Sequence, residues 1–142
     1  MSEHNLWGSV RKGLTDAADL KIDLMRVENI VQDGCPDVNF CFAGYEGWIE
    51  LKHADSPPAR DSTSVFKNGG LRDGQIIWIH RRARVGGNVW ILARCGKTIF
   101  LVDGRHAKKF NDYTYPELLE HSDWYHIGAR VDWKSLLKII AA

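Results

Sequence analysis

A largely apolar part of the chain, the sequence GCPDVNFCFAGYEGWIELK at residues 34–52, contains three charged residues that could act together. Asp37 follows a proline, and Glu50 and Lys52 are two positions apart near the end of the stretch. Strand periodicity turns Glu50 and Lys52 to one face and the aliphatic residues between and beside them to the other. A hairpin would bring Asp37 toward the same face. We therefore expect two carboxylates and one ammonium on one side of a sheet edge.

This combination of side chains predicts a divalent-cation site. Mg²⁺ prefers oxygen ligands and usually takes only one or two carboxylates from a protein, here Asp37 and Glu50. The backbone carbonyl of Leu51 is a natural third ligand. Lys52 would orient or deprotonate a metal-bound water, or balance charge on a phosphate. The sequence does not distinguish between these roles. The alternative is a solvent-facing cross-strand salt bridge of little energetic value.

The remaining pattern predicts the elements that would position this site. A long polar segment at 53–70, rich in Pro and Gly, reads as a functional or mobile loop. Apolar periodicity predicts helices at 3–14, 71–85, 115–121 and 132–142, and strands at 24–30, 38–42, 48–52, 88–94, 97–103 and 125–131. This order indicates an α/β fold with a mixed central β-sheet flanked by helices and a C-terminal helical tail.

Composition narrows the class of protein further. A chain of 142 residues has the length of one domain, and its net charge is +1. Residues 1–51 hold nine acidic and four basic residues, whereas residues 52–84 hold seven basic and three acidic ones. Such a split suits an enzyme that holds a cation beside a polyanion, although an ordinary solvated surface would also produce it. No bilayer-spanning apolar run or signal-peptide core is visible, and the three cysteines form no CxxC pair, so we expect a cytoplasmic protein.

These motifs together resemble a known family. The segments GCPDV and WIELK, the helix LRDGQIIWIHRRARVGGNVWIL at 71–92 and the RVEN at 26–29 resemble the PD-(D/E)XK nuclease superfamily. The nearest likeness is to its VRR-NUC-type and phage Holliday-junction-resolvase-like members. The resemblance covers about residues 3–103 and implies one nuclease domain with a restriction-endonuclease-like core and an extension at 104–142.

The resemblance also implies roles for particular residues. Asp37 and Glu50 would be metal ligands, and Lys52 the catalytic lysine. Gln75 would be the helix glutamine that touches the site or the DNA backbone, also counted as catalytic. Many family members carry a further acid, for which Glu3 and Glu28 are rival candidates. Mg²⁺ is the implied cofactor, with Mn²⁺ able to replace it.

The activity implied by the resemblance is hydrolysis of DNA phosphodiesters. Branched DNA is the expected substrate, cut by a homodimer because a junction presents two related strands. Duplex DNA, a non-specific or nicking phage nuclease, and a catalytically silent DNA-binding module on the same fold are the alternatives. A phage-encoded protein of this kind would act in the host cytoplasm. Residues expected to contact DNA phosphates are Arg60 and Lys67 in the long loop, and Arg72, Arg81, Arg82 and Arg84 on the following helix.

Overall fold

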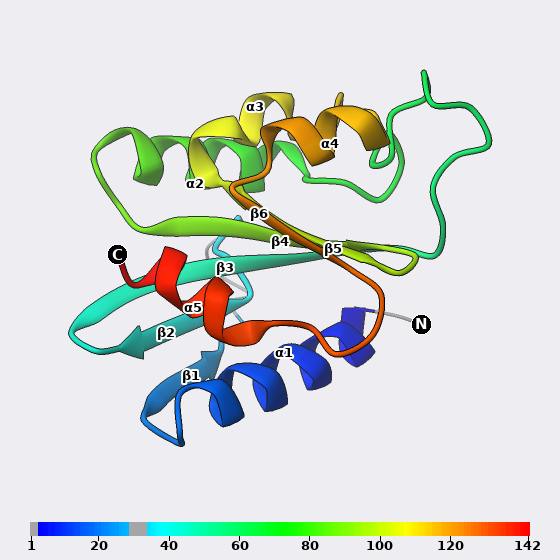
Figure 1. The fold of residues 1–142 in the computed structure, drawn as a ribbon. Coiled ribbons are helices and arrows are strands. Elements are labelled where there is room, and N and C mark those ends of the chain that lie inside the picture. Colours follow the sequence, from blue (N-terminus) through cyan, green and yellow to red (C-terminus); the bar gives the residue numbers. More distant parts are fainter. Residues whose placement is uncertain (1–2, 29–33) are drawn as a thin grey trace.

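One mixed β-sheet forms the centre of the molecule (Figure 1). The computed structural model describes residues 3–28 and 34–142. Its six strands lie in chain order across the sheet, and only β3 and β4 are parallel. The strands are β1 (Ile22–Arg26), β2 (Val38–Phe42), β3 (Tyr45–Ala54), β4 (Val89–Cys95), β5 (Thr98–Asp103) and β6 (Trp124–Ile127). The predicted α/β class with a mixed sheet is therefore confirmed.

Helices cover both faces of this sheet. Figure 1 shows α1 (Glu3–Ala17) and α5 (Trp133–Ile140) on one face. The other face carries α2 (Asp73–Arg84), α3 (Ala107–Phe110) and α4 (Tyr115–His121), with the short helix η1 (Gly104–His106) leading into α3. Strands β4 and β5 are apolar along almost their whole length because both of their faces are buried. No helix in the described parts of the chain is both long and apolar enough to cross a bilayer.

Two buried clusters result, one on each face. Leu6, Val10 and Leu14 of α1 pack with Ile49 and Leu51 of β3 on the first face. The second cluster lies between the sheet and the helices α2, α3 and α4. Glu50 and Lys52 alternate away from the first cluster, as strand periodicity predicts, and so enter the layer beneath α2.

Several boundaries differ from those that the sequence predicts. β1 begins at Ile22 rather than at residue 24, because it pairs with the whole of β2, and residues 29 and 30 of the predicted strand lie outside the described residues. β3 is longer than the predicted 48–52, because Ala43 and Gly44, both with positive φ, form a two-residue turn that lets pairing continue to its end. The sequence did not predict η1 and α3.

The position of β3 corrects a further expectation. Asp37, Glu50 and Lys52 do not gather at an outer sheet edge, because β3 pairs with β2 on one side and β4 on the other. β3 lies in the interior of the sheet because β4, which follows α2 in the chain, pairs with it in parallel.

The segment 104–142 is built into the fold. Strand β6 pairs with β5 and forms one border of the sheet, opposite β1. The apolar side of α5, with Leu136, Leu137 and Ile140, is buried in the same cluster as α1. Gly13 allows α1 and α5 to approach, since a Cβ at this position would lie 2.2 Å from the Trp133 indole nitrogen. The predicted helical tail is thus a packed layer of the domain.

Candidate active site

Asp37 lies at the start of β2, directly opposite Glu50. The antiparallel register pairs Val38 with Ile49, which places the residue before Val38 across from the residue after Ile49. The backbone N–H of Leu51 donates a hydrogen bond to Asp37 Oδ2 at 3.0 Å. The aspartate is therefore fixed against the backbone of β3, on the side of the strand that carries Glu50.

Glu50 is a buried carboxylate with two different oxygen environments. Its exposed fraction is 1%. Oε2 accepts a hydrogen bond from Gln75 Nε2 at 2.9 Å and lies 3.5 Å from Lys52 Nζ. Oε1 is buried as well and has no hydrogen-bond partner within the described residues. Buried polar atoms are normally satisfied, so this oxygen is open to a further ligand when Glu50 is ionised.

Burial and neighbouring charge make the ionised form of Glu50 costly. The pKa of Glu50 is raised from 4.5 to about 8, chiefly by burial and next by the negative charge of Asp37, while the Lys52 ammonium lowers it. A proton on Glu50 can also bridge to the Asp37 carboxylate, which again favours the protonated form. In the absence of another cation, one proton is therefore retained near neutral pH.

Gln75 joins Glu50 to the first turn of α2. Its Oε1 accepts a hydrogen bond from the Arg72 N–H at 2.9 Å, which completes a capping interaction at the helix start. Its Nε2 donates to Glu50 at the same time. Both ends of the buried amide are thus satisfied, and the side chain sets the orientation of Glu50.

The turn before Asp37 packs directly on the same helix end. Gly34 has a φ of +91°, and a Cβ at this position would lie 2.2 Å from the carbonyl oxygen of Gly74. Only glycine fits such an approach without a shift of the backbone. This contact fixes the start of β2 relative to α2, and so fixes Asp37 relative to Gln75.

The donor set fits a divalent cation. Asp37 and Glu50 offer oxygen ligands, and the unsatisfied Glu50 Oε1 and the raised pKa of Glu50 are features that a bound cation would compensate. No cluster of three or more Asp, Glu, His or Cys side chains suited to a metal occurs within residues 3–28 and 34–142. Two carboxylates are what Mg²⁺ commonly takes from protein, with water filling the rest of its shell. The Leu51 carbonyl as a third ligand stays a prediction.

Neither of the two rival acids is among the charges that act on Glu50, although Glu28 follows Val27, whose N–H donates to the Asp37 carbonyl at 2.7 Å. Glu3 and Glu28 are both exposed, and the charges that shift the pKa of Glu50 come from Asp37 and Lys52. The sequence places Glu3 on the inward stripe of α1, but the buried stripe runs through Leu6 and Val10, so the first-turn glutamate points to solvent. A role for either acid remains a prediction.

The predicted phosphate contacts are spread over the molecular surface. Arg72 occupies the N-cap of α2, next to Gln75. Arg81, Arg82 and Arg84 are exposed at the other end of that helix, and the Arg82 guanidinium lies 4.6 Å above the ring of Trp78. Arg60 and Lys67 are exposed in the loop that joins β3 to α2. The structure therefore brings together Asp37, Glu50, Lys52 and Gln75, with Arg72 adjacent.

Cys35 is a neighbour of the site that sequence reasoning overlooked. Burial raises the pKa of its thiol, the nearby carboxylates of Glu50 and Asp37 raise it too, and the Arg82 guanidinium lowers it. The same charges that surround the candidate site therefore act on this thiol. Its position two residues before Asp37 was the available signal in the sequence.

Comparisons with known proteins give limited guidance. No family model matches the chain, and no curated protein matches it. A solved structure described as a VRR_NUC domain is similar over 68% of this chain and 89% of its own length, at 16% identity and a TM-score of 0.44. A likeness at that level does not decide what this chain does, so the evidence for function comes from the site.

Proposed function

We propose that the protein is a metal-dependent nuclease that hydrolyses DNA phosphodiesters at the Asp37–Glu50–Lys52 site. The observation that carries the proposal is the buried Glu50 Oε1, which has no hydrogen-bond partner among the described residues and lies on a carboxyl whose pKa is raised to about 8. A structural carboxylate would be hydrogen-bonded at both oxygens or exposed to water. A carboxylate held ready for a cation has the features seen here.

Each side chain then has a distinct task. Asp37 and Glu50 would hold the divalent cation, Mg²⁺ or Mn²⁺, and Gln75 keeps Glu50 Oε2 engaged so that Oε1 is left for the ion. When bound, such an ion stabilises negative charge on a phosphate and makes a bound water easier to deprotonate. Lys52 Nζ, 3.5 Å from Glu50 Oε2, contributes positive charge beside the reacting phosphate and can hold or pass on a proton.

Branched DNA is the substrate that we propose first, cut by a homodimer in the cytoplasm of the cell. This specialisation rests on the sequence resemblance alone. The exposed arginines at the end of α2 and the exposed Arg60 and Lys67 would contact DNA phosphates on either side of the cut. Phosphate contacts of this kind position the nucleic acid without reading its sequence, which suits selection by shape.

A cleavage assay tests the proposal. Labelled four-way junction, duplex and single-stranded DNA are incubated with the protein in Mg²⁺, in Mn²⁺ and in EDTA. We expect cleavage only with metal, and loss of it in Asp37→Asn and Glu50→Gln. Glu46→Gln is the matched control, since Glu46 lies on the same strand but is exposed.

The possible outcomes separate the alternatives. Equal cleavage by Glu50→Gln and wild type would show that the reaction does not use this site. Binding of branched DNA without cleavage in either metal would favour a silent DNA-binding module. Cleavage of all three DNAs at similar rates would support a nuclease but remove the junction preference.

A further inference from the structure

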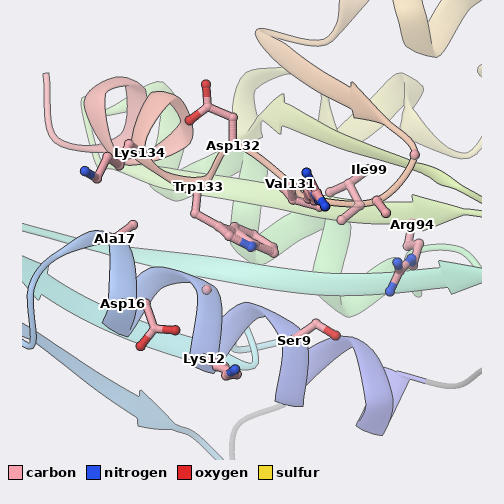
Figure 2. Close-up of a pocket in the computed structure, with 14 residues that line it drawn as sticks. Ser9, Lys12, Asp16, Ala17, Arg94, Ile99, Val131, Asp132, Trp133 and Lys134 are labelled. Carbon is pink, nitrogen blue, oxygen red and sulfur yellow. The ribbon is translucent and has the colours of Figure 1, made fainter.

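An open cavity of about 670 Å³ lies on the face of the sheet opposite the carboxylates (Figure 2). Its walls come from α1, from the end of β4, from the start of β5, from the loop between β6 and α5, and from the first turn of α5. Small-molecule sites in proteins commonly have volumes of about 300–1,000 Å³. The cavity therefore has the size of a small ligand or of one or two nucleotides, and is too small for a folded partner.

Positive charge dominates this cavity. Lys12 of α1, Arg94 of β4, Arg130 of the loop and Lys134 of α5 all line it. Lys12, Arg130 and Lys134 form no ion pair with any other described residue. Like charges around one cavity repel one another, and an ordinary mixed-charge surface would place acidic partners beside Lys12, Arg130 and Lys134.

The acidic residues of the cavity do not neutralise this charge. Asp132 accepts a hydrogen bond from the Ser135 N–H and caps α5, and Figure 2 shows its carboxylate pointing away from α1. Asp16 of α1 is the other carboxylate in the lining. The three cations without an ion pair, Lys12, Arg130 and Lys134, therefore exceed the two carboxylates of the lining, one of which is engaged at a helix end.

The start of α5 adds to the same potential. A helix N-terminus carries partial positive charge, and acidic residues are favoured in its first turn. The first turn of α5 holds no acidic residue and contains Lys134 instead. The Asp132 carboxylate at the N-cap offsets part of this positive potential, and Lys134 adds a further cation to the lining of the cavity.

The loop that carries Arg130 is held in an unusual conformation. Arg130 has a φ of +57°, a left-handed value that costs free energy for a residue with a side chain. Neighbouring contacts fix the loop, because Gly128 N–H donates to the Lys97 carbonyl at 2.8 Å and His126 contacts the Ala129 carbonyl at 3.1 Å. An arginine is thus kept at a position where glycine would be easier.

From these observations we infer that the cavity binds a phosphate group, carried either by a small nucleotide or by a nucleic-acid strand. Arg and Lys together suit phosphate, which accepts several charge-assisted hydrogen bonds and carries more charge than a carboxylate. The aliphatic and indole parts of Val131, Ile99 and Trp133 complete the lining and offer apolar surface to the rest of such a ligand. This site does not depend on the carboxylates of the other face.

Titration calorimetry in EDTA tests the inference without using cleavage. The probes are inorganic phosphate, adenosine monophosphate and single-stranded oligo(dT), each titrated into wild type and into the double variant Lys12→Ala/Lys134→Ala. Both lysines are exposed, so the variant should fold normally. We expect its affinity for the binding probe to fall about tenfold or more, with a shallower dependence on salt. The double variant Lys108→Ala/Lys109→Ala is the matched control, since both lysines are exposed on α3 at the other face.

A second variant separates lost charge from lost structure. Arg130→Gly removes a cation and relieves the left-handed strain, so the melting temperature should stay the same or rise while phosphate affinity falls. Binding of the nucleotide would assign a small-molecule phosphate, and binding of oligo(dT) alone would assign a nucleic-acid backbone. The inference is overturned if no probe binds, or if both variants bind as tightly as the control. Because metal is absent, these results are independent of whether the nuclease proposal holds.

Discussion

Replacing Glu50 by glutamine should make the metal-free protein more stable at alkaline pH. The folded protein raises the pKa of this carboxyl from 4.5 to about 8. At about 1.4 kcal/mol for each pKa unit, ionising Glu50 in the folded state costs up to about 5 kcal/mol. A typical domain has a stability of about 5–15 kcal/mol, so the effect should be large.

The sign of the pH dependence follows from proton uptake. Between about pH 4.5 and 8 the folded state holds a proton on Glu50 that the unfolded state has released. The free energy of unfolding therefore falls as pH rises through this range. Glu50→Gln cannot ionise, and its amide oxygen can still accept from Gln75, so its stability should lack this fall.

Denaturant unfolding followed by circular dichroism in EDTA, from about pH 5 to 9, measures the effect. We expect wild type and Glu46→Gln to lose several kcal/mol across the range relative to Glu50→Gln. Mg²⁺ added at the alkaline end should restore the stability of wild type but not of Glu50→Gln, because a bound cation compensates the ionised carboxylate. Parallel pH profiles for wild type and Glu50→Gln would refute the reasoning, since Glu50 would then not be a buried, protonated carboxyl.

Three further changes probe the neighbours of Glu50. Lys52→Met removes the cation that lowers the pKa of Glu50, so the Mg²⁺ affinity measured by calorimetry near neutral pH should fall. DNA cleavage should drop about a hundredfold or more. Unchanged cleavage would contradict a catalytic lysine. Gln75→Leu removes the hydrogen bonds that Gln75 makes to Glu50 Oε2 and to the first turn of α2. The free energy of unfolding, measured with denaturant, should fall by about 1–3 kcal/mol, and Mg²⁺ binding should weaken. An unaltered Mg²⁺ affinity would count against the positioning role. Gly34→Ala should lower the melting temperature more than Gly44→Ala does. Both glycines have a positive φ, but only Gly34 lies against a neighbouring carbonyl. Equal decreases in melting temperature would exclude that contact as the cause.

The sequence predicted the local part of the site well. Alternation along β3 depends only on the strand itself, so the shared face of Glu50 and Lys52 followed directly from the residues. The hairpin itself was predicted, but its register was not, because residues 43–47 were expected to form the loop and the structure has a two-residue turn at Ala43 and Gly44. These features depend on neighbours in the chain.

Properties that depend on distant packing could not be predicted in the same way. Glu50 and Lys52 are buried because α2 covers them and β4 pairs with β3. Neither contact can be predicted from the hairpin sequence. The charged residues of the cavity on the opposite face come from four separate parts of the chain, so no single sequence motif predicts the cavity.

The one parallel pairing in the sheet has a consequence for the speed of folding. The other strand pairs are antiparallel, whereas β3 and β4 pair in parallel across the longest connection in the sheet, residues 55–88, which contains the loop and α2. Non-local pairings of this kind are slow to form, so we expect this crossover to limit the folding rate. It is also the step that delivers Gln75 to Glu50. Substitutions at the contact between Gln75 and Glu50 should therefore slow refolding as well as impair metal binding. The same residues would then determine both the chemistry of the site and the rate of folding.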